Sequence, residues 1–139
     1  MPTAHYLADT SAFARLQKPS VADALAPLVA AGKVAVCAPV CFELGYTARN
    51  SDDYRLLADR LAAFPSVPVG EGDHRRALDV QADLCGQGGH RALSLVDALV
   101  AAAAEARDLV VLHYDVDFER VAGITGQPHE WVVPRGTAD

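Results

Sequence analysis

Five acidic residues stand where their carboxylates could act together, each beside an apolar segment: Asp9, Glu43, Asp97, Asp115 and Asp117. Carboxylates that lie close together repel one another and raise each other's pKa unless a cation neutralises them. A set of oxygen donors without histidine or cysteine is typical of Mg²⁺ or Mn²⁺. One or two such ions can activate water for phosphodiester hydrolysis, so the pattern indicates chemistry that needs no protein nucleophile.

Short apolar segments predict the strands that would position these acids. Residues 5–8 lead into Asp9, and residues 109–112 lead into Asp115 and Asp117. The carboxyl ends of parallel strands meet at one edge of a sheet, where ligands bind in α/β proteins. The acids therefore converge if their strands are neighbours.

Two helices are expected to carry the remaining acids. Residues 34–37 form a third β-type run, and Pro39 then suits the first turn of a helix that continues to roughly Arg49. Glu43 lies one turn into this helix. Asp97 lies in the first turn of an alanine-rich helix that begins after Ser94 and feeds the strand at 109–112.

A simpler interpretation exists for each of these acids, and for Glu43 it is a solvated helix residue. Ser94 and Asp97 have the spacing of a capping box, so the two side chains could serve only the helix start. Asp9 could likewise be an N-cap, and Asp115 and Asp117 could form a turn or cap the next helix. Ser94 could also orient the helix end that presents Asp97 to a cation.

The remaining pattern predicts an α/β fold, a three-layer α/β/α sandwich with a mainly parallel central sheet of four to five strands. Short edge strands are expected at 67–69 and 130–133. Further helices are predicted at 20–31, capped by Ser20, closed by Gly32 and kinked or split by Pro27, and at 51–64, 73–86 and 118–124.

Length and composition bound the class of protein. A chain of 139 residues fits one domain, 1–139, and 51% hydrophobic with 22% charged residues describes a globular protein. No apolar run reaches the length of a membrane span, and the N-terminus lacks a leader pattern, so a cytoplasmic location is expected. Three cysteines without zinc spacing predict buried free thiols. The net charge of −6 argues against a polyanionic partner, but setting the five site acids aside leaves 13 acids against 12 Lys plus Arg.

Four segments in this order resemble the PIN-domain nucleases, and within them the VapC-type toxins of type II toxin-antitoxin systems: Y-L-A-D-T-S-A-F, P-V-C-F-E-L-G-Y-T-A-R, S-L-V-D-A-L-V-A-A-A-A-E and V-L-H-Y-D-V-D-F. The resemblance covers nearly the whole chain. It implies an Mg²⁺- or Mn²⁺-dependent endoribonuclease that cuts RNA, often a structured translation RNA. It also implies a homodimer that is silenced by a small cognate antitoxin similar to VapB.

The same resemblance assigns roles to individual residues. It implies an acidic quartet of Asp9, Glu43, Asp97 and Asp115, with Asp117 as an additional ligand. Thr10 occupies the hydroxyl position that supports the first Asp. His113 departs from the pattern, because many relatives carry Thr or Ser two residues before the Asp, and its role is left open. Weak candidates for contacts with RNA phosphates are Arg15, Arg49 and Arg91.

Two other function classes compete with this interpretation. A PIN-like module could bind RNA or a protein without cutting. A receiver-type signalling domain would also cluster acids at strand ends, but it needs a lysine after a late strand, and the lysines here are Lys18 and Lys33.

Overall fold

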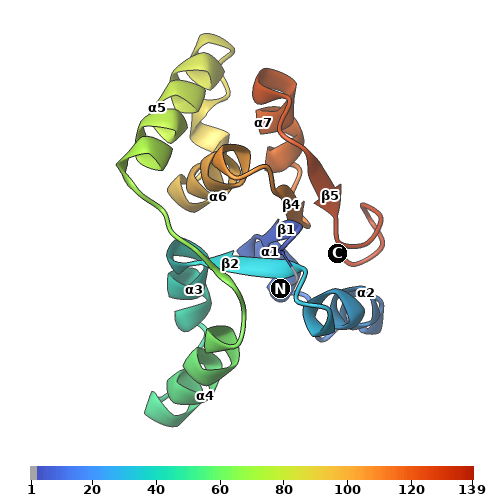
Figure 1. The fold of residues 1–139 in the computed structure, drawn as a ribbon. Helices are drawn as coiled ribbons and strands as arrows, with labels where there is room; N and C mark the ends of the chain where they lie inside the picture. The colour runs from blue at the N-terminus through green and yellow to red at the C-terminus, as the bar shows by residue number, and fades with distance from the viewer. Residues whose placement is uncertain (1–2) are drawn as a thin grey trace.

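A parallel five-stranded sheet organises the protein, whose computed structural model describes residues 3–139. The strand order is β3-β2-β1-β4-β5, and every neighbouring pair is parallel (Figure 1). This confirms the predicted fold class. The strands are β1 (Tyr6–Ala8), β2 (Val34–Cys37), β3 (Ser66–Val67), β4 (Val110–His113) and β5 (His129–Trp131).

Helices cover both faces of the sheet and complete three layers (Figure 1). They are α1 (Thr10–Phe13), α2 (Pro19–Ala30), α3 (Ala38–Gly45), α4 (Ser51–Ala62), α5 (Glu71–Gly86), α6 (Leu95–Ala106) and α7 (Asp117–Thr125), with a 3₁₀ turn η1 (His90–Ala92). Side chains alternate between the faces because successive residues of a strand point to opposite sides. Leu7 and Val111 pack with α3, α5, α6 and α7, whereas Ala8 and Leu112 pack with α1, α2 and the C-terminal tail.

The order of the strands creates a switch point between β1 and β4. From β1 the chain builds outward through β2 to β3, and it then returns to add β4 and β5 on the other side. The backbone N–H of Asp9 donates to the carbonyl of Leu112 at 2.9 Å, so β1 and β4 stay paired up to the edge. This edge is where open α/β sheets bind their ligands.

The helix predicted at 20–31 has different limits in the structure. Helix α2 starts at Pro19, with Lys18 and not Ser20 at the N-cap, because proline suits the first helical position. Pro27 does not split the helix. Pro27 and Asp23, whose carbonyl loses its helical partner, are both exposed, so water can take the missing bond.

Side-chain hydrogen bonds accompany three other helix boundaries, of which the start of α4 agrees with the prediction and the end of α3 and the start of α5 do not. Helix α3 ends at Gly45 and not near Arg49, and the Thr47 hydroxyl donates to the carbonyl of Leu44 at 2.7 Å just beyond it. Asn50, one residue before the predicted start, accepts from the backbone N–H of Asp53 at 2.9 Å and caps α4. Asp73 accepts from the N–H of Gly70, so α5 starts at Glu71 and not at Asp73.

The prediction of buried free thiols is met in part. All three cysteines are free thiols, as expected, but only Cys37 is buried, while Cys41 is half-buried and Cys85 is exposed. Across residues 3–139, no helix has the length and apolar character that a membrane crossing requires.

The C-terminal tail is held against the sheet by Tyr114, a buried residue just after β4. Its hydroxyl accepts from the backbone N–H groups of Gly136 at 2.8 Å and Ala138 at 2.9 Å. It donates to the Asp139 side chain at 2.7 Å. The guanidinium of Arg15 lies over the Tyr114 ring, 4.5 Å from its centre. One hydroxyl therefore fixes three residues of the tail.

Replacing Tyr114 by phenylalanine removes these three bonds and leaves two backbone N–H groups without an acceptor. We expect Tyr114→Phe to lower the free energy of unfolding by about 2 kcal/mol, measured by urea denaturation. Tyr54→Phe is the matched control, because Tyr54 is 58% exposed, and it should change stability by less than about 0.5 kcal/mol. Equal stability of the two variants would contradict the role given to the Tyr114 hydroxyl.

Candidate metal centre

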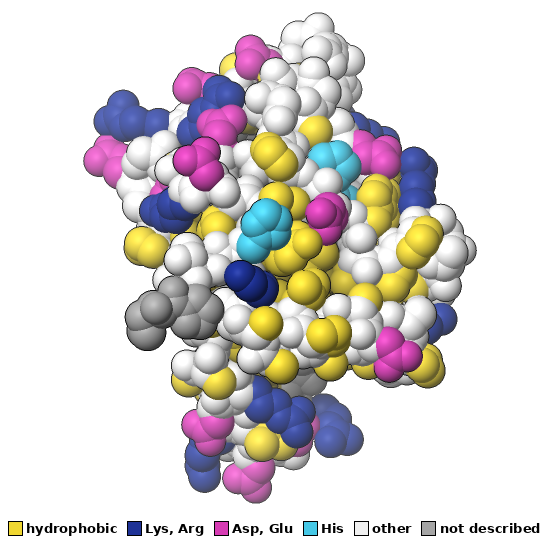
Figure 2. Space-filling model, turned by 45° about the vertical axis from the view of Figure 1, so that its right-hand side comes forward, with side chains coloured by type: hydrophobic (Ala, Val, Ile, Leu, Met, Phe, Trp, Pro, Cys, Tyr) yellow, Lys and Arg dark blue, Asp and Glu magenta, His cyan; other side chains and the backbone are white. Residues whose placement is uncertain are grey.

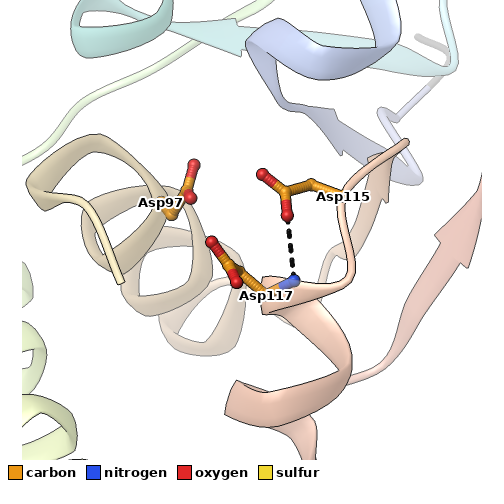
Figure 3. A group of neighbouring side chains, drawn as sticks. All are labelled: Asp97, Asp115 and Asp117. Carbon is orange, nitrogen blue, oxygen red and sulfur yellow. Dashed lines mark hydrogen bonds between the residues drawn. The ribbon is translucent and has the colours of Figure 1, made fainter. Parts of the chain in front are cut away.

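Three carboxylates converge at the switch-point edge of the sheet. Asp97 comes from α6, Asp115 from the loop after β4, and Asp117 from the first position of α7 (Figure 3). One carboxylate oxygen of each residue lies within 4.8 Å of those of the other two. Asp115 Oδ1 also accepts from the backbone N–H of Asp117 at 2.9 Å, which fixes these two residues relative to each other.

Helix capping explains only part of how Asp97 is placed. Ser94 is the N-cap of α6, and its hydroxyl accepts from the backbone N–H of Asp97 at 3.1 Å. The Asp97 carboxylate is directed toward Asp115 and Asp117 (Figure 3). Ser94 thus orients the helix end, and the carboxylate remains available to the cluster.

Asp9 caps a helix and also presents an unused oxygen. Its Oδ2 accepts from the backbone N–H of Ser11 at 3.0 Å, which makes Asp9 the N-cap of α1. Its Oδ1 is buried and has no hydrogen-bond partner among residues 3–139. A buried carboxylate oxygen without a partner is costly, so a cation is a natural occupant for the space beside it.

Glu43 is held by a hydroxyl from α1. The Thr10 hydroxyl donates to Glu43 Oε1 at 2.6 Å, a contact that joins the start of α1 to α3. The resemblance implied that the Thr10 hydroxyl supports Asp9, and in the structure this hydroxyl donates to Glu43 instead. Asp9 turns Oδ2 toward the Ser11 amide, which leaves the Thr10 side chain to reach α3.

Burial and like charge act together on the pKa values of the site. Burial raises the pKa of Asp97 to about 8, and the neighbouring Asp9, Asp115 and Asp117 add to the shift. The pKa of Asp9 is raised by burial, with Asp115 and Glu43 contributing. Burial and Asp115 raise the pKa of Asp117, while Arg120 opposes the shift. These mutual effects connect all five predicted acids, although only three of them form the tight group.

The donor set fits a hard divalent cation. The site acids present only carboxylate oxygens, and Mg²⁺ and Mn²⁺ prefer such ligands. The unpartnered Asp9 Oδ1 and the raised pKa values of Asp9 and Asp97 indicate that positive charge beside these carboxylates would be stabilising. Asp97, Asp115 and Asp117 form a group that could hold such an ion, and Asp9 lies close enough to raise the pKa of Asp97.

The contacts of the three predicted arginines lie outside the carboxylate cluster. Arg15 donates to the carbonyls of Ser11 and Ala138 and covers Tyr114. Arg49 pairs with Asp53 at 2.8 Å on the surface. Arg91 is exposed on η1, before α6. Their assignment as RNA contacts stays a prediction.

Ser11 and His113 support the site in ways that the sequence did not reveal. The Ser11 hydroxyl accepts from the backbone N–H of Tyr114 at 2.9 Å and links α1 to the end of β4. His113 accepts from the backbone N–H of Asp115 at 3.0 Å. The only sequence signal for either residue was its position two places from a site aspartate.

Comparison with known proteins agrees with the geometry. The fold and the cluster define an α/β domain with an all-carboxylate centre at its switch point. Residues 6–124 match the family described as PIN domain. The chain therefore belongs to the PIN domain family, and the resemblance in its sequence is confirmed.

Curated relatives place the chain within the VapC group. It is 45% identical over 134 residues to Ribonuclease VapC51 of Mycobacterium tuberculosis, covering 96% of this chain and 97% of the relative. Ribonuclease VapC18 of the same organism is 41% identical over 134 residues, covering 95% and 98%. The fold also matches DNA-bound VapBC from Salmonella typhimurium, with a TM-score of 0.75 at 16% identity over 94% of this chain and 100% of that chain.

Replacing Asp97 by asparagine should stabilise the metal-free protein at alkaline pH. The folded-state pKa of Asp97 is raised from 3.8 to about 8, so the folded protein binds this proton more tightly than the unfolded chain does. Stability contributed by the protonated form is therefore lost as the pH rises from about 4 to 8. In EDTA at pH 8 we expect Asp97→Asn to raise Tm by roughly 5 °C, equivalent to about 1–2 kcal/mol.

The gain should shrink toward pH 5, and Mn²⁺ should raise Tm more in the wild type than in Asp97→Asn. Asp83→Asn removes an exposed acid of α5 and is the matched control. Parallel Tm curves for the wild type and Asp97→Asn across this pH range would contradict the raised pKa of the Asp97 carboxylate.

Proposed function

We propose that this protein is a metal-dependent endoribonuclease of the VapC type, which hydrolyses phosphodiester bonds of RNA with water. The convergence of Asp97, Asp115 and Asp117 beside Asp9 carries the proposal. Two relatives named as ribonucleases, 45% and 41% identical over nearly the whole chain, support it.

The cofactor proposed is Mg²⁺ or Mn²⁺, as one or two ions. When bound, such an ion supplies an acidified water and positive charge for the phosphate oxygens. The residues that would hold it are Asp97, Asp115 and Asp117, together with the unpartnered oxygen of Asp9. Thr10 keeps Glu43 at the rim of the site through its 2.6 Å hydrogen bond, where the carboxylate can orient water or accept a proton.

The thiols are poorly suited to replace this chemistry. Burial raises the pKa of Cys37 to about 11, so its nucleophilic thiolate is scarce at neutral pH. Burial also raises the pKa of Cys41. A receiver-type domain is disfavoured too, because Lys33 precedes β2, at the end of the strands opposite to the acids.

The RNA is proposed to approach through an open cleft beside Asp115. The cleft has a volume of about 480 Å³, and its lining includes Arg15, Trp131 and Arg135. On the face shown in Figure 2, Lys and Arg side chains are interspersed with acids around the margin and do not form one basic patch. Because the chain carries a net charge of −6, phosphate attraction would depend on a few arginines and the metal-loaded centre.

Replacing a site aspartate should abolish RNA cleavage. Replacing an aspartate far from the site should leave cleavage unchanged. With Mg²⁺ or Mn²⁺ and total RNA, we expect Asp9→Asn and Asp97→Asn to reduce the cleavage rate by at least about 100-fold. Asp83→Asn removes the same charge from the exposed face of α5 and should leave the rate unchanged. Cleavage that persists unchanged in Asp9→Asn and Asp97→Asn would falsify the assigned site. RNA binding without cleavage or metal binding in the wild type would indicate a silent PIN-like module instead.

A small VapB-like antitoxin is the proposed partner. The similar structures from Salmonella typhimurium and Rickettsia felis are VapBC complexes. This chain has an apolar groove of about 440 Å³ between α3 and α4, whose lining includes Phe42, Tyr54 and Leu57. Phe42 and Tyr54 are 68% and 58% exposed, which leaves aromatic surface for an amphipathic segment to cover. A homodimer and a cytoplasmic location belong to the same proposal.

A bulky charge in the groove should release the antitoxin without affecting catalysis. We expect Ala58→Arg, in the groove lining, to weaken co-purification with a co-expressed VapB-like protein from a neighbouring reading frame by at least about tenfold. Ala82→Arg, on an exposed position of α5, should retain the partner. Both variants should cut RNA at the wild-type rate when purified alone. Full retention of the partner by Ala58→Arg would place the antitoxin elsewhere.

A further inference from the structure

A fully buried histidine, two residues before Asp115, lies next to the carboxylate cluster. His113 is the last residue of β4 and is 0% exposed. Its Nδ1 lies 3.0 Å from the backbone nitrogen of Asp115, and its Nε2 lies 2.8 Å from Nδ1 of His129. Both ring nitrogens are therefore engaged, one toward the site and one toward β5.

The contacts allow only one placement of the ring protons. The backbone N–H of Asp115 can only donate, so Nδ1 of His113 must be unprotonated and accept. A neutral imidazole then carries its proton on Nε2, which donates to Nδ1 of His129. His129 in turn has its proton on Nε2. A proton on Nδ1 of His113 would face the Asp115 N–H and break the chain of bonds.

Packing from β5 and α7 holds the His113 ring in this orientation. The rings of Phe118 and Trp131 lie 4.8 Å and 5.0 Å from it, centre to centre. His113 pairs with Trp131 across the parallel strands, and its carbonyl accepts from the N–H of Val132 at 2.7 Å. The last strand of the chain thus fixes a ring that lies against the site.

The same ring controls the loop that carries two of the site acids. Nδ1 of His113 fixes the main chain of Asp115, and Oδ1 of Asp115 accepts from the N–H of Asp117. The second oxygen of Asp115 is left free to face Asp97 (Figure 3). Loss of the His113 acceptor would release the first bond in this series.

We propose that His113 and His129 form an ordered pair of neutral imidazoles that positions Asp115 for cation binding. This inference rests on the proposed function, since it takes the cluster of Asp97, Asp115 and Asp117 as the cation site. His113 is a positioning residue in this account and does not contact the ion. Groups that orient metal ligands commonly change metal affinity by 10- to 100-fold when they are removed.

The proton placement can be tested without metal. Long-range ¹H–¹⁵N correlation spectra of the metal-free protein, labelled at histidine nitrogens, distinguish a protonated from an unprotonated ring nitrogen. We expect both His113 and His129 to carry their proton on Nε2. A proton on Nδ1 of His113 would overturn the proposal, whatever the activity of the protein.

Two variants separate the bond to Asp115 from the bond to His129. In His113→Asn the amide oxygen can stand near the position of Nδ1 and accept from Asp115, whereas in His113→Gln the amide reaches toward His129. We expect His113→Gln to bind Mn²⁺ about tenfold more weakly than the wild type, measured by paramagnetic resonance of free Mn²⁺. His113→Asn should stay within about threefold. Thermal unfolding of both variants checks that they fold.

The outcomes distinguish this inference from the proposed function. Equal Mn²⁺ affinity of the wild type and both variants overturns the positioning role and leaves the cation site intact. Absence of Mn²⁺ binding by the wild type overturns the cation site, and the positioning role with it. If a variant does not fold, the ring-nitrogen spectra of the wild-type protein still decide the proposal.

Discussion

Mutual repulsion between buried and half-buried carboxylates is the constraint around which this protein is built. Asp97, Asp115 and Asp117 face one another at the edge of the sheet, and Asp9 is almost fully buried beside them. Removing such groups from water is costly, and bringing them together adds to the cost. Part of the cost is offset locally, because Asp97 and Asp117 lie in the first turns of α6 and α7, where the helix dipole favours negative charge. The remainder is the cost that the proposed divalent cation would offset.

The strand order determines where the carboxylates that repel one another meet. The sheet places β1 and β4 side by side, and the chain leaves them in opposite directions. Two bonds tie their ends together, from Asp9 N–H to the Leu112 carbonyl and from Tyr114 N–H to the Ser11 hydroxyl. The loops that carry the acids therefore start from a rigid base. A rigid base matters because carboxylates that repel one another would otherwise separate.

Local patterns in the sequence predicted much of this arrangement. Short apolar strands followed by acids are visible in a single chain, and Ser94 was correctly identified as the cap of α6. Helix starts were less certain where several residues could be the N-cap, as with Ser20 against Lys18. Those choices depend on small energy differences between neighbouring positions.

Contacts between distant segments could not be predicted in this way. The bond from Thr10 to Glu43 joins residues 33 apart in the sequence, and that from His113 to His129 joins residues 16 apart. Their partners are set by how the helices and strands pack. The sequence shows a histidine before an aspartate, but only the register of β4 against β5 shows what lies on its other side.

The bonds of the Tyr114 hydroxyl give the last residues of the chain an importance that their composition does not suggest. Gly136, Ala138 and Asp139 carry none of the site carboxylates, yet all three are bound to the residue that immediately precedes Asp115. A protease that trims these residues, or a purification tag that pulls on them, would disturb Tyr114 and, through it, the loop that carries the site.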